Sequence, residues 1–483
     1  MPLEDLLHPY LKHYLEMPEW LKASAGRAYA WLPRRIRLGS AYDSFCAELA
    51  ASRNAAAASR LAREKLEATL RWALQTVPAY RHLRGLLRRS DDPVQLLARL
   101  PVTDKLDIKR NVERYLSSAM PASLRLRTFT GGSTRHPMQF YLQKHLSRPK
   151  EYAFIQDFRN RAGAGPNDLT LALRGRSVPG AAHSDGNLWM HEPIRRQLIL
   201  SSDHLESRYM PRYAEVLARH RPAFIEAFPS ALYPLARWLA ANPLHEFTTG
   251  VRGVMLFSEN VYGFQMRMFR SVFRCPVLKH YGHSERVLMA ASMPDDERYF
   301  FWPQYGWFEL LDGDDQPITQ PGVLGHVVGT SFDNKVMPLV RYRTGDLAVL
   351  GAGVHPALPG YIACEGIEGR LQEFVVCRDQ RLISVTTLGA AHFEELELAD
   401  AIQYEQREPG AIVLRIMTPR APAPEAVRRI EQAVKEKTQG GCEVSVMCVE
   451  RIDRTPRGKR RMLIQHLDIS GYLGAAAIEY RRA

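Results

Sequence analysis

The sequence predicts an α/β protein with a large N-terminal domain and a small α+β domain at the C-terminus. Residues 40–90 are rich in Ala, Leu and Arg, and their apolar residues recur at the three- and four-residue spacing of helices. From about residue 165, short apolar runs alternate with amphipathic stretches, a pattern typical of a mostly parallel sheet covered by helices. We therefore expect a large domain over residues 1–370, helical over 1–95, and a small domain over 371–483.

The expected strands of the large domain are short apolar runs. They are LTLALRG (169–175), PAFIEAF (222–228), GVMLFSE (253–259) and CPVLKHYG (275–282), and PSALYPLARWLAA is an expected helix among them. After residue 300, Gly, Asp and Pro punctuate shorter strand-like pieces such as GHVVGTSF and LVRYRTGDLAVL. Ligands of such sheets bind beyond the carboxyl ends of the strands, so we look for the site there.

The last hundred residues predict a unit of their own. GAIVLRIMT is an expected strand, PEAVRRIEQAVKEKTQ a helix and CEVSVMCVERI a second strand. Gly440 and Gly441 follow the helix and provide the residues at which helices commonly end.

Composition narrows the classes of partner. The net charge of +13 and the pI of about 9.5 favour association with acidic partners, such as a nucleotide, an anionic lipid or an acidic carrier protein. No basic run interleaves with aromatic residues at a regular spacing, and no zinc-finger or RNP-like signature is present, so we do not expect nucleic-acid binding. No apolar run approaches the roughly 20 residues of a membrane span, which predicts a cytoplasmic chain without a signal peptide. The basic segment 19–38 is compatible with peripheral contact to an anionic membrane.

The six cysteines are scattered without a CxxC pair, so neither a zinc site nor a disulfide framework is expected.

The stretch TFTGGSTRHPMQF (128–140) carries the first candidate site. Its small and hydroxyl-bearing residues offer backbone N–H groups and hydroxyls to the oxygens of a phosphate; they are Thr130, Gly131, Gly132, Ser133 and Thr134. The alternative is an ordinary polar turn between two strands.

Three more motifs contain candidate charged groups. In KHYGHSERV (279–287), Glu285 follows an expected strand, where a carboxylate can bind Mg²⁺; the alternative is a surface Glu paired with Arg286. In PLVRYRTGDLAVL, a strand ending at Gly345–Asp346 would bring a carboxylate to a turn, to accept ribose hydroxyls or to cap that turn. In RIDRTPRGKRRML, Lys459 lies in a basic loop that is otherwise a solvated charge run.

Together and in this order, the motifs resemble those of the adenylate-forming superfamily of acyl-CoA synthetases, adenylation domains and luciferases, and within it the phenylacetate-CoA ligase and CapK-like group. The matching stretches are LPVTDKLDIKRN (100–111), TGGSTRHP (130–137), FSENV (257–261), YGHSE (281–285), MPLVRYRTGD (337–346), EGR at 368–370 and RTPRGK (454–459). The resemblance implies the adenylate-forming fold, a large α/β domain followed by a small mobile lid domain.

By this resemblance, the chain uses ATP and Mg²⁺ to activate a carboxylic acid. The phosphate loop 130–134 would hold the β- and γ-phosphates, and Glu285, with Thr134, would bind Mg²⁺. Lys459 would bridge the acid and the α-phosphate in the displacement of pyrophosphate. The residues implied around the adenylate are Ser258, Glu259, Tyr281, Gly282, Asp346 and Arg370, and Glu373 falls at the hinge between the two domains.

The chain departs from the family in the phosphate loop and after the hinge. Arg135 stands where the family has glycine, and its guanidinium can donate to phosphate; His136 follows it. The segment after Glu373 lacks the glycine-containing loop of thioester-forming relatives. Free CoA, the phosphopantetheine of an acidic acyl carrier protein and a non-thiol acceptor therefore remain open, as does a non-catalytic nucleotide-binding member.

The acyl pocket is expected around EAFPSALY (226–233) and LKHYGH (278–283). Its candidate residues are Phe228, Ser230, Tyr233, His280 and His283, and with the aromatic run YFFWPQYGWF (299–308) they would suit a flat aryl acid. The alternative is that the aromatic residues belong to the core.

Overall fold

The computed structural model describes most of the chain. The described residues are 3–7, 10, 13–14, 17–88, 92–129, 138–165, 167–174, 178, 187–201, 207–242, 250–258, 261, 263–312, 314–367, 374–380, 382–384, 388, 401–417, 421–450, 452 and 463–467. Among them, no helix has the length and apolar character needed to cross a membrane.

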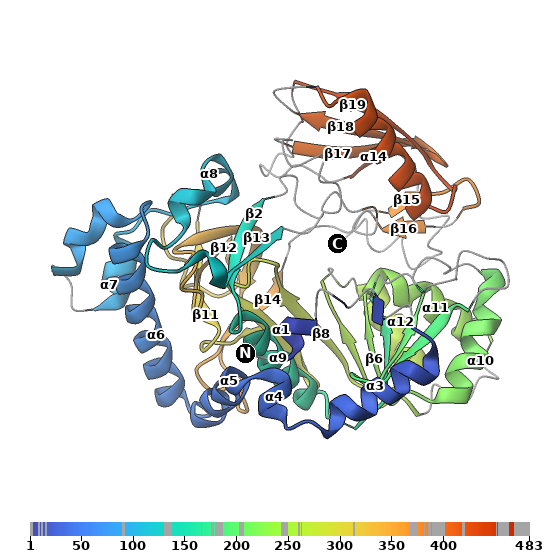
Figure 1. The fold of residues 1–483 in the computed structure, drawn as a ribbon, viewed down its shortest axis with the longest axis horizontal. Coiled ribbons are helices and arrows are strands. Elements are labelled where there is room, and N and C mark those ends of the chain that lie inside the picture. The colour runs from blue at the N-terminus through green and yellow to red at the C-terminus, as the bar shows by residue number, and fades with distance from the viewer. Residues whose placement is uncertain are drawn as a thin grey trace.

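Helices form the N-terminal part of the chain and the layers around the main sheet (Figure 1). Their bounds are α1 Leu3–Leu7, α3 Glu19–Trp31, α4 Arg34–Leu38, α5 Ser40–Ala51, α6 Ala55–Thr76, α7 Pro93–Ala98, α8 Lys105–Arg110, α9 Ser147–Arg161, α10 Met210–His220, α11 Pro229–Ala241 and α12 Gly263–Phe273. The helical pattern over residues 40–90 is confirmed, and α11 coincides with the expected PSALYPLARWLAA.

The strands of the large part are mostly short. They are β1 Arg125–Phe129, β2 Gln139–Gln143, β3 Thr170–Leu173, β4 Trp189–Glu192, β5 Gln197–Leu200, β6 Phe224–Ala227, β7 Gly253–Leu256, β8 Val277–Gly282, β9 Met289–Met293, β10 Asp296–Phe301, β11 Gly306–Leu311, β12 Leu324–Ser331, β13 Tyr342–Leu350 and β14 Ile362–Ile367. β1 and β2 pair as an antiparallel hairpin.

The described residues contain a sheet of twelve strands in the order β11-β12-β13-β14-β10-β9-β8-β7-β6-β3-β5-β4. The strands β5, β3, β6, β7 and β8 run parallel, as expected for residues 165–282. The other pairs are antiparallel, namely β4 with β5 and all pairs from β8–β9 to β11–β12, so the expectation of a mostly parallel sheet is wrong for the sheet as a whole. β9 and β10 are joined by a tight turn, which favours antiparallel pairing, whereas β12, β13 and β14 are joined by longer loops and no helix crosses over between them.

The parallel strands are buried on both faces. Neighbouring residues of one strand belong to different cores: Ile225 and Val254 pack with α10, α11 and α12, whereas Phe224 and Met255 pack with α5 and α9. Since successive side chains of a strand point to opposite faces, the two groups of helices cover opposite sides of this sheet.

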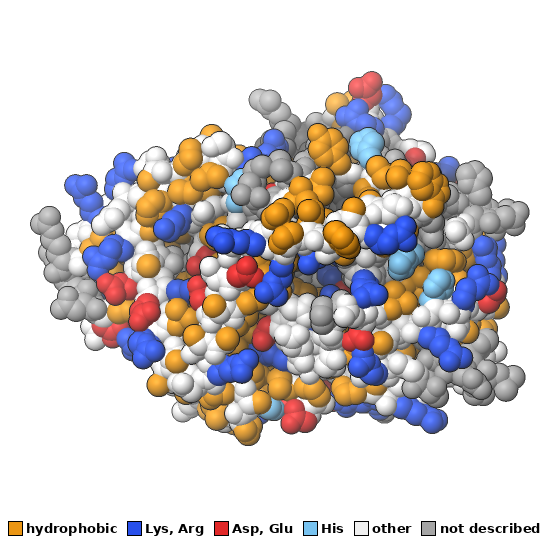
Figure 2. All heavy atoms as spheres, turned by 60° about the horizontal axis from the view of Figure 1, so that its bottom comes forward, with side chains coloured by type: hydrophobic (Ala, Val, Ile, Leu, Met, Phe, Trp, Pro, Cys, Tyr) orange, Lys and Arg blue, Asp and Glu red, His pale blue; other side chains and the backbone are white. Residues whose placement is uncertain are grey.

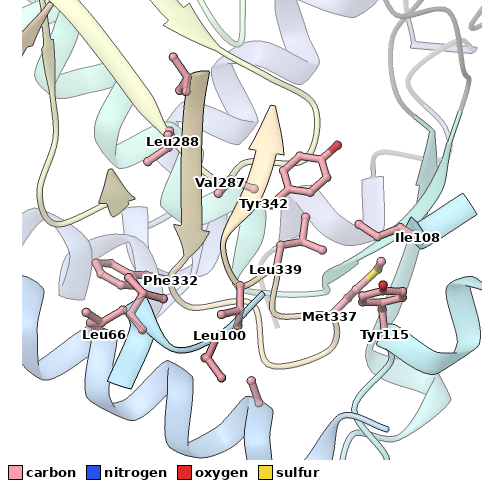
Figure 3. Close-up of a cluster of buried hydrophobic side chains, with 14 of the residues drawn as sticks. Leu66, Leu100, Ile108, Tyr115, Val287, Leu288, Phe332, Met337, Leu339 and Tyr342 are labelled. Carbon is pink, nitrogen blue, oxygen red and sulfur yellow. The ribbon is translucent and has the colours of Figure 1, made fainter. Parts of the chain in front are cut away.

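A third core holds the antiparallel strands against the N-terminal helices. Figure 3 shows it, with Leu66 of α6, Val287, Phe332 and Tyr342 among its buried side chains. The segment before α8 joins this core along β13, because Thr103 N–H donates to the Arg341 carbonyl at 3.0 Å and Arg343 N–H donates to the Thr103 carbonyl at 2.8 Å. This pairing fixes where α8 begins.

The C-terminal elements form a separate group in Figure 1. They are β15 Phe374–Val376, β16 Leu382–Ser384, β17 Ala401–Glu408, β18 Ala411–Met417, α14 Pro424–Lys437, β19 Glu443–Cys448 and β20 Leu463–Gln465. β18, α14 and parallel β19 confirm the expected strand–helix–strand unit, and Gly440 after α14 has a positive φ of 75°. The expected boundary after Arg370 and the hinge residue Glu373 lie outside the described residues, so the domain limits stay a prediction.

Candidate functional site

A cavity of about 1610 Å³ lies at the carboxyl ends of the parallel strands. Four successive strands each contribute a wall residue at or just after their last residue: Arg174 follows β3, Phe228 follows β6, Phe257 follows β7 and Gly282 ends β8. This is the edge of an α/β sheet at which ligands bind. The cavity continues to Lys105 and Glu285 and is also lined by residues of α3, α4 and α9.

Two hydrogen bonds link the motifs YGHSE and RYRTGD at this edge. The Tyr281 hydroxyl donates to Asp346 Oδ2 at 2.8 Å, and the Tyr342 hydroxyl donates to Glu285 Oε1 at 2.8 Å. Each motif therefore supplies the tyrosine that holds the carboxylate of the other. The structure thus brings together Tyr281, Glu285 and Asp346, which the sequence singled out separately.

Glu285 is not the surface residue of the alternative interpretation. It is 3% exposed, and Lys105 Nζ lies 3.2 Å from its Oε1. Burial by itself raises the pKa of Glu285, but Lys105, His283 and the Tyr342 hydroxyl outweigh it and lower the pKa to about 2. The carboxylate is therefore ionised at any physiological pH, and it lines the cavity.

Asp346 lies within β13 rather than at the end of a strand, which corrects the expected turn. The chain leaves the regular ladder there, because three residues of β13, from Thr344 to Asp346, stand opposite one residue of β12. Gly345 supports this bulge with a φ of 85°. The Asp346 carboxylate is buried and is held by Tyr281.

The acyl-pocket candidates separate into two groups. Phe228, His280 and His283 line the cavity, and Ser258, in the left-handed conformation with a φ of 63°, lines it too. Tyr233 does not belong to the described walls of this cavity; it is buried in the core and packs edge-on against Phe269. Ser230 lies in the first turn of α11, and its side chain is outside the described part.

The aromatic run 299–308 belongs to the core, as the alternative interpretation held. Tyr299, Phe300, Phe301, Trp302 and Tyr305 are all buried in the hydrophobic clusters.

His280 is buried between the rings of Phe158 and Phe257, whose centroids lie 5.5 and 5.0 Å from its own. Burial, followed by the positive charges of Arg174 and Arg161, lowers the pKa of His280 to about 3. Its imidazole is therefore neutral at pH 7. Gly282 leaves it room, because a Cβ there would lie 3.1 Å from His280 Cε1.

Several candidates lie outside the described residues. They are the phosphate loop Thr130, Gly131, Gly132, Ser133, Thr134 and Arg135, with His136, and also Glu259, Arg370, Glu373 and Lys459. The residues on either side of the loop, Phe129 and Gln139, pair across the β1–β2 hairpin, so the loop connects these two strands.

The sequence analysis missed Lys105, Tyr342 and Arg174 as site residues. Lys105 and Tyr342 lie inside stretches quoted for the resemblance, so a charged or hydroxyl-bearing residue in such a stretch was the available signal. Arg174 lies at the carboxyl end of the expected strand 169–175, and the carboxyl ends of such strands form the ligand-binding edge of the sheet.

The six cysteines are free thiols in the structure. The described residues contain no group of three His, Cys, Asp or Glu side chains that could hold a metal ion. Glu285 contributes a carboxylate to the cavity wall, and its Oε1 accepts from Tyr342 and pairs with Lys105. That donor set suits Mg²⁺, which commonly takes one or two protein carboxylates together with phosphate oxygens.

Comparison with known proteins identifies the fold. No protein-family model and no curated protein matches the chain. A crystal structure of 2-hydroxyisobutyryl-CoA ligase with 2-HIB-AMP and CoA, in the thioesterification state, matches with 17% identity and a TM-score of 0.53, over 89% of this chain and 94% of that chain. The same ligase in the postadenylation state with R3-HIB-AMP matches with 17% identity and a TM-score of 0.50, over the same shares of the two chains. The chain has the mixed α/β fold of adenylate-forming enzymes with a C-terminal domain, as the sequence predicts.

Proposed function

We propose that this chain is an ATP-dependent ligase that activates a carboxylic acid, aryl in the first instance, as its acyl-adenylate. It then transfers the acyl group to a thiol, either CoA or the phosphopantetheine of an acyl carrier protein. The observation that carries the proposal is the pair of crossed tyrosine–carboxylate hydrogen bonds, Tyr281–Asp346 and Tyr342–Glu285, at the ligand-binding edge of an adenylate-forming fold.

In this proposal the described carboxylates bind the nucleotide. Asp346, oriented by Tyr281, accepts the ribose hydroxyls. Glu285 would hold Mg²⁺, which when bound would supply positive charge to offset that of the leaving pyrophosphate. Lys105 and Tyr342 fix the Glu285 carboxylate before the nucleotide arrives, so little reorganisation is needed when it binds.

The chemistry is an in-line displacement. A carboxylate oxygen of the acid attacks the α-phosphorus of ATP, and the bond from that phosphorus to the bridging oxygen of the β-phosphate breaks, releasing pyrophosphate. Lys459 stabilises the charge between the two reactants, and the phosphate loop 130–134, with Arg135, holds the leaving group. The thiol then attacks the acyl carbon and releases AMP.

Pyrophosphate release tests the first half-reaction. We would measure it with ATP, Mg²⁺ and a panel of aryl and aliphatic acids, with hydroxylamine as acceptor so that the unidentified natural acceptor does not limit turnover. We expect acid-dependent release that Lys459→Ala lowers by roughly 100-fold or more, the effect of removing a group that stabilises transition-state charge. The control Lys435→Ala removes an exposed lysine from α14. Unchanged pyrophosphate release in Lys459→Ala would reject the assignment of this lysine. If none of the acids in the panel causes pyrophosphate release, the non-catalytic nucleotide-binding alternative is favoured.

The acceptor is a separate question. We propose a thiol because the fold is shared with a CoA ligase, whose structure was solved with CoA. Amide or ester formation is the alternative, because the segment after Glu373 departs from thioester-forming relatives. Release of AMP with CoA, with a carrier protein or with a simple amine, each supplied in turn to the adenylate-forming reaction, decides among the three.

We also propose that the N-terminal helices contact an anionic membrane surface. Seven of the eleven large apolar side chains exposed in the described residues belong to the first 36 residues, with Trp20 and Trp31 at 70% and 92% exposure. Arg34 and Arg35 of α4 are exposed beside them. Figure 2 looks onto the side that lies at the bottom of Figure 1, near α3 and α4, and shows Lys and Arg interspersed with apolar side chains. Tryptophan with basic residues is typical of interfacial helices.

Co-sedimentation with vesicles tests this contact. We expect binding to vesicles of phosphatidylglycerol and phosphatidylcholine, weak binding to phosphatidylcholine alone, and loss of binding in Trp20→Ser/Trp31→Ser. The control Val354→Ser removes an apolar side chain that is 65% exposed elsewhere. Equal sedimentation of the double variant would contradict the proposal.

A further inference from the structure

A cluster of charged side chains stands in the wall of the cavity, apart from Glu285 and Asp346. Arg159 Nε lies 3.2 Å from Glu226 Oε1, and Arg174 Nη1 lies 3.4 Å from Glu226 Oε2. Gln197 Nε2 also donates to Glu226 Oε2, at 3.3 Å. All four residues line the cavity. Two guanidinium groups thus share one carboxylate.

The cluster carries an excess of positive charge in a sheltered place. The side chains of Glu226 and Arg159 are 4% and 18% exposed, so solvent screens them little. His280, the neighbouring titratable group, adds no charge at pH 7, because burial and the nearby arginines hold its pKa at about 3. The cluster therefore has a net charge of +1, since two arginines stand against one glutamate.

Arg174 is the residue of this cluster whose N–H groups are available to bind a ligand. Its side chain is 35% exposed. Its guanidinium lies 4.2 Å from the centre of the ring of Phe257, the residue that precedes Ser258 in the chain. Among the described residues its hydrogen bonding consists of the single long contact to Glu226. A guanidinium has several N–H groups and matches a carboxylate in a two-bond geometry, so Arg174 can bind an anion without leaving Glu226.

The position of Arg174 relates it to the acyl group. It follows β3, whereas Glu285 and Asp346, the two carboxylates that the proposed function assigns to Mg²⁺ and ribose, lie beyond β8 and in β13. Phe228 and Phe257 line the same cavity as Arg174 and Gly282. An acid whose reacting carboxylate lies near Gly282 can extend along these rings toward Arg174.

We propose that the acid activated here carries a second carboxylate, which Arg174 binds at the far end of the acyl pocket. This inference rests on the proposed adenylating function and names its substrate class. A second carboxylate balances the charge of the cluster and accepts from the remaining N–H groups of Arg174, whereas an unsubstituted aryl or alkyl acid displaces water from the partly exposed guanidinium and supplies no acceptor. Arg159 and Gln197 are positioning residues, because they hold the Glu226 carboxylate that orients Arg174.

Matched acids test the inference in the pyrophosphate assay. The pairs are benzoate against benzene-1,4-dicarboxylate and hexanoate against hexanedioate. As a control, 4-hydroxybenzoate carries a neutral polar group in place of the second carboxylate. We expect kcat/KM to favour each diacid by roughly 10- to 100-fold, the discrimination that a charge-assisted hydrogen bond supplies. Arg174→Met should remove the preference by raising KM for the diacids while leaving the monoacids nearly unchanged, and Arg174→Lys should restore part of it.

Two further measurements keep the outcomes distinct. Arg219→Met, which removes an exposed arginine of α10, is the control. If no acid releases pyrophosphate, the proposed function fails, and calorimetric binding of benzene-1,4-dicarboxylate to the wild type and to Arg174→Met still tests the inference. A preference for monoacids or for 4-hydroxybenzoate, or an equal effect of Arg174→Met on both members of a pair, would overturn it while leaving adenylation intact.

Discussion

Lys105 and Glu285 form a buried ion pair that the rest of the site surrounds. The two side chains are 13% and 2% exposed, and 3.2 Å separates Lys105 Nζ from Glu285 Oε1. Removing the lysine leaves the carboxylate out of water without its ammonium partner, although the hydrogen bond from the Tyr342 hydroxyl remains. We expect Lys105→Met to lower the free energy of unfolding by about 3–5 kcal/mol, measured by urea denaturation at pH 7.

An exposed pair supplies the control for this prediction. Arg71 and Glu67 of α6 lie 2.6 Å apart, with side chains 56% and 51% exposed. Because water screens them, Arg71→Met should cost only about 0–1 kcal/mol. Lys105→Met/Glu285→Gln should regain part of the loss, and a double variant as unstable as the sum of both single variants would contradict the pairing.

His280 predicts a pH dependence of stability. Its pKa is about 3 in the folded chain against 6.5 for an ordinary histidine, so below pH 6.5 the unfolded chain takes up a proton that the folded chain does not. This histidine therefore lowers the free energy of unfolding as the pH falls from 6.5 toward 3. Between pH 7.5 and pH 5 the wild type should lose about 2 kcal/mol more than His280→Gln, measured by urea denaturation of both at the two pH values. The same loss in both proteins would contradict a neutral His280.

At the scale of elements, α8 positions Lys105. Asp104 caps this helix, accepting from Leu106 N–H at 2.7 Å and Asp107 N–H at 3.0 Å, and Lys105 is its first residue. We expect Asp104→Ala to cost about 1 kcal/mol and, in addition, to lower pyrophosphate release, because Lys105 loses its fixed approach to Glu285.

The cap of α6 provides the comparison. Asn54 accepts from Ala57 N–H at 2.8 Å, so Asn54→Ala should destabilise the protein by a similar amount. It should leave pyrophosphate release unchanged at temperatures where the protein is folded. If both variants lower release equally, α8 has no special relation to the site.

The sequence could predict those elements whose pattern is local. The strands β3, β6, β7 and β8 and the helix α11 were predictable because apolar runs and helical periodicity depend on neighbouring residues. The direction of β9–β14 was not, because strand pairing depends on turns and on distant partners. Asp346 illustrates this. TGD has the composition of a turn, yet β12 pairs with β13 both before and after Asp346, and the residue becomes part of a bulge within the strand.

The site was predictable as a set of motifs and not as a geometry. Glu285 and Asp346 could be named from the resemblance, whereas Tyr342 and Lys105 act through contacts across 57 and 180 positions of the chain, respectively (342 − 285 and 285 − 105). No spacing in the sequence reports such contacts. Tyr233 was misjudged for the related reason that one face of α11 packs into the core.

At the scale of the whole molecule, the C-terminal elements have a core of their own. The described cluster around Tyr404, Leu414, Ile430 and Val434 contains no residue from before Val375. All seven tryptophans precede residue 310. We therefore expect urea unfolding followed by tryptophan fluorescence to report the large part alone, whereas far-UV circular dichroism also reports α14 and its sheet, so the two curves should not coincide.

A tryptophan in the C-terminal part completes this experiment. Met447 of β19 is 50% exposed, and Met447→Trp should add the missing transition to the fluorescence curve. Coincident curves in the wild type would show that the two parts unfold as one unit.

The crossed hydrogen bonds also bear on how genes of this kind can recombine. Tyr281 and Glu285 lie on one side of any junction placed between residues 286 and 341, and Tyr342 and Asp346 lie on the other. A chimera joined in that interval pairs each tyrosine of one parent with a carboxylate of the other. Such chimeras should fold and work only when both parents carry the same residues at all four positions.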